Sequence, residues 1–164
     1  MEQATKEARK PGDHFVEVNG LKLHYLDWGT TGKRTHVLLH GMTGNAHNWD
    51  AFGPQWSKDS RLLALDQRGH GDSDWTKEGY PVQSFATDLY EFALELNLGP
   101  FDATGHSLGS RNLIAFAGDH SDMLDHLILS ECGPEVPKEG ARNVNKKAGS
   151  PPAFFRTQED ATAW

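Results

Sequence analysis

A serine set between two glycines is the residue in this sequence best suited to covalent chemistry. Gly105-His106-Ser107-Leu108-Gly109 lies between a predicted strand and a predicted helix. There, the G-x-S-x-G pattern forms a tight turn that strains the serine and exposes its Oγ, and the glycines leave out clashing Cβ atoms. The N–H of Leu108, at the helix N-terminus, can then point at a bound carbonyl oxygen. We therefore predict a nucleophilic Ser107 and an oxyanion donor at Leu108; the alternative is an ordinary Gly-Ser turn.

A second glycine-rich turn, His40-Gly41-Met42-Thr43-Gly44, closes an earlier buried strand. Its glycines let the backbone approach a substrate, so we expect the N–H of Met42 to be the second oxyanion donor. Without Ser107, an ordinary strand-to-helix loop would explain this turn. Two glycine loops at neighbouring strand ends favour an oxyanion hole.

A polar loop at residues 66–73, with the sequence DQRGHGDS, follows the next strand. Asp66, His70 and Asp72 are possible metal ligands, but no further ligands stand at a recognisable metal-site spacing. We therefore predict no metal here. Instead, we expect Asp66 and Arg68 to hold the loop by hydrogen bonds while its glycines permit a tight turn.

The elements that must position these residues are an antiparallel hairpin followed by alternating strands and helices. Apolar residues alternate on both sides of Asn19-Gly20, which is a two-residue hairpin signal. We predict further strands at 36–40, 61–66, 101–106 and 126–131. We predict helices at 45–56, from an N-cap at Ser84 to about residue 96, and at 107–117. This order predicts the α/β fold class, with parallel strands flanked by helices on both faces.

Length and charge exclude several classes of function. The 164 residues suit one compact domain, and the net charge of −7 disfavours nucleic acid as a partner. One cysteine, Cys132, allows no internal disulfide, and the N-terminal ten residues have no apolar core that would make a secretory signal. No apolar run approaches the length that crosses a bilayer of about 30 Å. We expect a cytoplasmic chain that does not bind membranes.

With these motifs in this order, the chain resembles the α/β-hydrolase fold superfamily, in particular its serine esterase and lactonase-like members. The resemblance rests on the His-Gly loop, the Asp-x-Arg-Gly-x-Gly-x-Ser segment and Gly-His-Ser-Leu-Gly, and it runs from about residue 15 to 164. It implies that Ser107 is the nucleophile and that the backbones of Met42 and Leu108 form the oxyanion hole. Relatives with an aspartate nucleophile, the epoxide hydrolases and haloalkane dehalogenases, carry Asp where this chain has Ser107.

The family's catalytic base has no clear counterpart in this chain. In the family the nucleophile is followed by an acid and then by a histidine after the last strand. Only His120 and His126 follow Ser107, and we expect them at the far end of a helix and at the opposite edge of the sheet. Some relatives place the acid after the sixth strand, which makes Glu131 the candidate. We expect the histidine, and the acid if it is not Glu131, beyond residue 164.

Such relatives have eight strands, and we count six here. We therefore expect the N-terminal part of a longer hydrolase, inactive alone, with a disordered arm over 1–13, an incomplete core over 14–132 and the start of a cap or lid over 133–164. Without a seventh strand, Leu127-Ile128-Leu129 would form an open apolar edge. Because such edges template aggregation, we predict poor solubility or dimerisation through this strand.

Two other functions fit the same residues. One is a non-catalytic module that binds a small carbonyl ligand at the Met42/Leu108 site. The other is a cofactor-less haloperoxidase or a carbon–carbon bond hydrolase. The predicted partner is a small ester, lactone or related carbonyl compound, and no phosphate-binding glycine motif calls for a nucleotide cofactor. Aromatic residues that could line an apolar acyl or ring pocket, or pack in the core, are Trp49, Trp75, Phe154 and Phe155.

Overall fold

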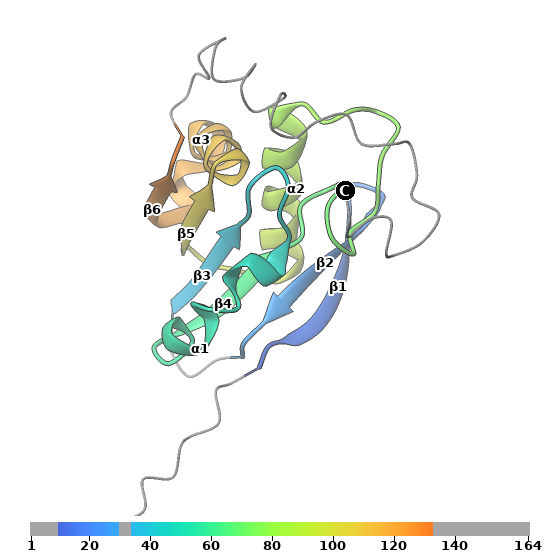
Figure 1. Cartoon of the computed structure of the whole chain (residues 1–164). Helices are drawn as coiled ribbons and strands as arrows, with labels where there is room; N and C mark the ends of the chain where they lie inside the picture. The colour runs from blue at the N-terminus through green and yellow to red at the C-terminus, as the bar shows by residue number, and fades with distance from the viewer. Residues whose placement is uncertain (1–9, 30–33, 133–164) are drawn as a thin grey trace, which may run out of the picture. The chain divides into compact units, whose positions relative to one another are not determined.

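A six-stranded mixed sheet carries the described part of the chain, residues 10–29 and 34–132 of the computed structural model (Figure 1). The strand order is β1-β2-β4-β3-β5-β6, with β1, β2 and β4 paired antiparallel and the remaining neighbours parallel. The predicted α/β class is confirmed. The strands are β1 (Gly12–Val18), β2 (Leu21–Asp27), β3 (Arg34–Leu39), β4 (Ser60–Leu65), β5 (Phe101–His106) and β6 (Leu124–Ser130). The helices are η1 (Ala46–Trp49), α1 (Gly53–Trp56), α2 (Val82–Glu95), α3 (Leu108–His120) and η2 (Ser121–Met123), where η marks a 3₁₀ helix.

The first hairpin has the turn that its sequence predicts. Val18 pairs with Leu21, and the two residues between them, Asn19 and Gly20, have φ angles of 51° and 72°. Two consecutive positive φ angles match the right-handed twist of the flanking strands. β1 begins at Gly12, inside the arm expected over 1–13, whereas residues 1–9 and the expected cap region 133–164 lie outside the described residues.

The single helix predicted over residues 45–56 is wrong. The chain instead forms the 3₁₀ turn η1 and the separate one-turn helix α1. Asn45 caps η1 through its side chain, and Pro54 stands at the start of α1. Proline lacks the N–H that would continue a preceding helix and is tolerated in the first turn, so it favours a new start here.

The start predicted for the next helix is also wrong. α2 begins at Val82 with Pro81 as its N-cap residue, and the N–H of Ser84 donates to the Pro81 carbonyl at 3.0 Å. Pro81 has φ −69° and ψ 148°, the extended backbone typical of a residue that caps a helix, so α2 begins directly after it and ahead of Ser84.

Alternating strand side chains build two apolar layers, one on each face of the sheet. Val37, Leu39 and Leu63 pack with residues of α2 and α3, whereas Leu38 and Leu62 pack on the other face with η1. The expected helices on both faces are therefore present. The second layer includes Trp49, which is buried in the core. None of the described helices combines the length and hydropathy needed to cross a membrane.

Strand β6 is an edge of the sheet in the described part of the chain. Leu127, Ile128 and Leu129 leave between 37% and 48% of their surface exposed, in agreement with the open apolar edge expected from the sequence. An exposed apolar edge strand pairs readily with another chain.

We predict that this edge drives self-association of the 18.2 kDa chain. Sedimentation velocity should show dimers or larger species, and Ile128→Lys should shift them toward monomer, because a charge on an edge strand opposes pairing. Phe52→Lys places the same charge at an exposed apolar residue of the α1 region and should leave association unchanged. A monomeric, cooperatively melting unmodified chain would contradict the prediction.

Candidate active site

The predicted reactive residues meet at the carboxyl ends of the parallel strands. β3 is hydrogen-bonded to β4 on one side and to β5 on the other, and all three run parallel. The chain therefore reverses its strand order at β3, and in open α/β sheets ligands bind beside the carboxyl ends of strands at such a point. The His40–Gly44 turn follows β3, and Ser107 follows β5.

Ser107 lies in a strained strand-to-helix turn. Its φ of 50° and ψ of −109° are an uncommon combination for a residue with a side chain, with a cost on the order of 1–3 kcal/mol. A Cβ on Gly105 would lie 2.5 Å from the backbone of α3, and one on Gly109 would collide with the Leu39 carbonyl. The Ser107 N–H donates to the Ser130 carbonyl at 2.9 Å. The turn expected from the glycine spacing is therefore present.

The first glycine loop lies against this turn. A Cβ placed on Gly41 would be 3.4 Å from the Ser107 Cβ. The Gly44 N–H donates to the Gly41 carbonyl at 3.0 Å, which closes a tight turn around Met42. Leu108 is the first residue of α3, where N–H groups have no intrahelical acceptor. The structure thus brings together the segments that carry Ser107, Met42 and Leu108.

A buried polar network behind the glycine loop fixes its position. His40 Nδ1–H donates to the Gly41 carbonyl at 2.7 Å, and Nε2 accepts the Gln67 N–H at 3.1 Å, which defines one neutral tautomer. The Gln67 amide donates to the His40 carbonyl at 2.8 Å and accepts from Asn112 of α3 at 2.7 Å. Sequence reasoning missed Gln67 and Asn112. The available signal was Asn112 itself, a polar residue next to the apolar Leu113 in the helix that follows Ser107.

Burial lowers the pKa of His40 from 6.5 to about 4, and its hydrogen bond to Gly41 only partly opposes this shift. The unfolded chain then takes up this proton near pH 6.5 and the folded chain only near pH 4. The free energy of unfolding should therefore be unaffected above that window and fall by about 2–3 kcal/mol between pH 7.5 and 4.5. Denaturant titrations at these pH values measure the fall. His40→Gln should remove most of it, and an equal fall in the variant would contradict the assignment.

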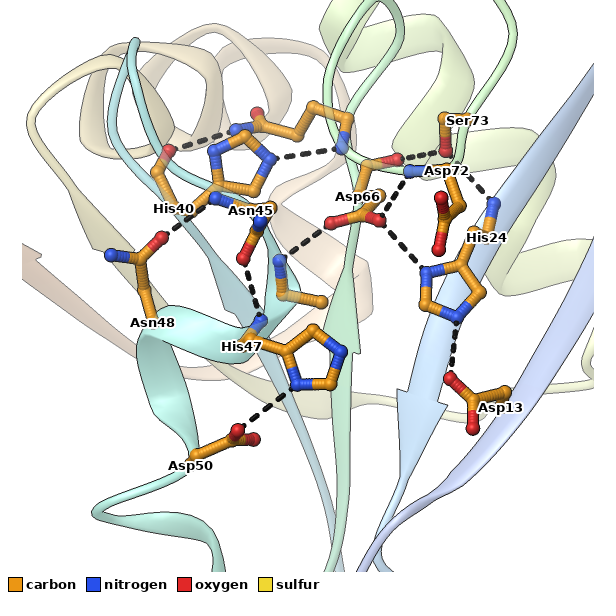
Figure 2. Close-up of polar contacts among 12 residues, drawn as sticks. Asp13, His24, His40, Asn45, His47, Asn48, Asp50, Asp66, Asp72 and Ser73 are labelled. Carbon is orange, nitrogen blue, oxygen red and sulfur yellow. Dashed lines mark hydrogen bonds and ion pairs between the residues drawn. The ribbon is translucent and has the colours of Figure 1, made fainter. Parts of the chain in front are cut away.

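Asp66 anchors the loop that follows β4 (Figure 2). One of its oxygens accepts the Ala46 N–H at 2.5 Å, and the other accepts from the Asp72 N–H at 2.9 Å and from His24 Nδ1 at 2.8 Å. The scaffold role expected for Asp66 is confirmed. Ligand atoms of His24, Asp66 and Asp72 lie within 4.8 Å of one another, but these hydrogen bonds engage both Asp66 oxygens, and we assign no metal to them. His70, the third ligand considered from the sequence, instead contacts the carbonyls of Arg68 and Met42.

Glu131 also lies at the carboxyl ends of the strands, because it directly follows β6. It has a φ of 61°, and its carboxylate accepts from His106 Nε2 at 3.1 Å. The two later histidines lie away from Ser107, as expected. His120 stacks on Tyr90 with ring centroids 4.0 Å apart, and His126 pairs with Asp102 near the start of β5. Across residues 10–29 and 34–132, no hydrogen bond joins the Ser107 side chain to a histidine ring.

Comparison with known proteins agrees with this geometry. Residues 37–161 match the family described as the alpha/beta hydrolase fold. The chain belongs to this family. The resemblance to the superfamily, deduced from the three motifs, is thereby confirmed, and the α/β-hydrolase fold accounts for the sheet order and the placement of the glycine loops.

Curated and solved α/β-hydrolase relatives share this region of the chain. A non-heme chloroperoxidase of Kitasatospora aureofaciens is 33% identical over 76% of this chain and 46% of its own length. A soluble epoxide hydrolase of a Corynebacterium species is 29% identical over 77% of this chain and 44% of its own length. The crystal structure of an alpha/beta hydrolase from Novosphingobium aromaticivorans superposes with a TM-score of 0.77 at 27% identity, over 82% of this chain and 49% of that one. The chain spans about half the length of the curated relatives it matches.

Proposed function

We propose that the protein is a serine hydrolase of carboxylic esters or lactones that works through an acyl-enzyme. The observation that carries this proposal is the strained turn at Ser107, set against the Gly41–Met42 loop. A turn that serves only to connect a strand to a helix has no need of a serine with positive φ, and strain of this kind is typical of functional sites. The hydrolase relatives support the general reaction class.

In the proposed reaction, Ser107 Oγ attacks the carbonyl carbon while its proton passes to a histidine base. The N–H groups of Met42 and Leu108 stabilise the negative oxygen of the tetrahedral intermediate. The leaving alcohol takes the proton, an acyl group remains on Oγ, and water then releases the acid by the same steps. We propose that Glu131 orients the base, because Glu131 follows β6, the parallel neighbour of the strand β5 that ends before Ser107.

We further propose that the histidine belongs to a segment of the full-length protein outside the described residues. Two findings support this placement: the positions of His120 and His126, and the greater length of the relatives. The N-terminal region alone should then bind carbonyl compounds without efficient turnover. A cytoplasmic location is also part of the proposal, since the single cysteine of these 164 residues permits no disulfide within them.

A cofactor-less haloperoxidase is the second candidate, because one relative at 33% identity is a non-heme chloroperoxidase. Ser107 and the two backbone donors would serve in that reaction too. Parallel assays of ester hydrolysis and of peroxide-dependent halogenation by the same preparation separate the two candidates by their relative rates.

The proposal is tested by rapid-mixing kinetics of the full-length protein with p-nitrophenyl acetate. We expect a burst of about one equivalent of p-nitrophenol followed by slower steady turnover, because acylation releases the phenol before the acyl-enzyme is hydrolysed. Tight binding of a carbonyl ligand with neither burst nor turnover would instead identify a binding module and contradict the proposal.

A further inference from the structure

A cleft opens beside the glycine loop that follows β3. It has a volume of about 440 Å³ and lies between residues 42–44 and the loop 69–80. Small-molecule sites in proteins span roughly 300–1,000 Å³, so this cleft can hold a group of the size of a substituted ring. We name it the Trp75 cleft after its most exposed aromatic residue.

The Trp75 cleft shares Met42 with the predicted reaction centre. Met42 lines it and directly follows Gly41, whose Cβ position lies 3.4 Å from the Ser107 Cβ. The backbone of Met42 is the proposed oxyanion donor, and its side chain is exposed at the cleft. A substituent on a carbonyl group bound at Ser107 is therefore within reach of this cleft.

The lining of the Trp75 cleft selects neutral, apolar groups. Trp75 is 76% exposed, and Met42 and Tyr80 are also exposed large side chains. Among the described residues that line the cleft, none carries a carboxylate, ammonium or guanidinium group. Aromatic faces and a methionine thioether pack favourably against rings. Three such side chains left in solvent at one place are typical of a binding site.

The walls of the cleft are preformed. A Cβ on Gly69 would lie 2.5 Å from the Tyr80 ring, so this position admits the tyrosine because it has no side chain. The Tyr80 hydroxyl contacts the backbone N–H and carbonyl of Thr76, each at 3.3 Å. Across the cleft, His70 Nε2–H donates to the Met42 carbonyl at 2.7 Å. Walls held in place before binding lower the entropic cost of taking up a ligand.

We propose that the Trp75 cleft binds a neutral aromatic ring of the ester or lactone substrate, an inference that rests on the proposed serine hydrolase activity. The ring stacks against Trp75 and Tyr80 while the carbonyl group lies at Ser107. Trp75 and Tyr80 thus determine substrate preference, and the chemical step remains with Ser107.

The test compares methyl phenylacetate and benzyl acetate, isomers that carry the ring on the acyl and the alcohol side, each against methyl acetate. The full-length protein should prefer one of these two aromatic esters. Trp75→Ala should lower the ratio of the kcat/KM for that ester to the kcat/KM for methyl acetate by roughly tenfold. Trp75→Phe should keep most of the ratio. Phe52→Ala removes an exposed aromatic side chain outside the cleft and should leave the ratio unchanged. A ratio unaltered by Trp75→Ala would overturn the proposal.

Binding of phenylacetamide, followed by calorimetric titration, separates this proposal from the proposed activity. The amide is neutral, carries the same ring and does not need to be hydrolysed. Binding that weakens about tenfold in Trp75→Ala, in a protein that hydrolyses no ester, would support the cleft and contradict the hydrolase. Ester hydrolysis together with amide binding that Trp75→Ala does not change would support the hydrolase and contradict the proposed role of the cleft.

Discussion

Ser107→Ala should lower the kcat of the full-length protein for esters by about 10⁴- to 10⁶-fold with little change in KM. The hydroxyl forms the covalent bond of the proposed reaction, so no other group of the site replaces it. The backbone donors of Met42 and Leu108 and the Trp75 cleft stay in place, so binding of the substrate should persist. Steady-state kinetics with the preferred aromatic ester measure both kcat and KM.

Ser84→Ala is the matched control for this substitution. Ser84 lies in α2 and not in the loops that follow β3 and β5. Its replacement should therefore leave kcat within a factor of about two of the value for the unmodified protein. If Ser107→Ala retained more than about a tenth of the activity while remaining folded, another residue would have to be the nucleophile.

Arg68→Ala should lower the free energy of unfolding by about 3–5 kcal/mol. Arg68 binds both carboxylate oxygens of Asp88 on α2 at 2.5 Å, and the two side chains are only 8% and 3% exposed. Asn19 in the hairpin turn donates to the same carboxylate at 2.9 Å. Removing the guanidinium leaves a buried, largely uncompensated negative charge. Urea unfolding followed by circular dichroism measures the loss.

The pair formed by Arg61 and Asp27 provides the control. Arg61 also makes two hydrogen bonds to one aspartate, the shorter at 2.9 Å, but its side chain is 30% exposed and that of Asp27 is 12% exposed. Because water screens such a pair, Arg61→Ala should cost no more than about 1 kcal/mol. Similar losses in Arg61→Ala and Arg68→Ala would contradict the role given to burial.

Local sequence patterns predicted the elements that carry the site. The Asn19-Gly20 hairpin and the glycines around Ser107 are reliable because each depends on a backbone conformation that few residues adopt. The single helix predicted over residues 45–56 is interrupted at Pro54, which lies at the start of the separate helix α1. A proline that follows a capped 3₁₀ turn favours a new start over continuation.

Contacts between distant segments could not be read from the sequence. Gln67 and Asn112 are 45 residues apart, and only the packing of α3 against the loop after β4 brings their amides together. Trp49 and Trp75 pose the same difficulty, since two tryptophans cannot be told apart by residue type as core residues or pocket residues. The fold buries the first against β3 and β4 and leaves the second at the cleft.

The most direct test of the central claim is to locate the adduct that a fluorophosphonate probe forms on the full-length protein. These probes phosphonylate activated serines, and peptide mapping by mass spectrometry identifies the modified residue. The proposed mechanism predicts a single adduct on Ser107, absent from Ser107→Ala and unchanged in Ser84→Ala. An adduct on another residue, or labelling that survives Ser107→Ala, would contradict it.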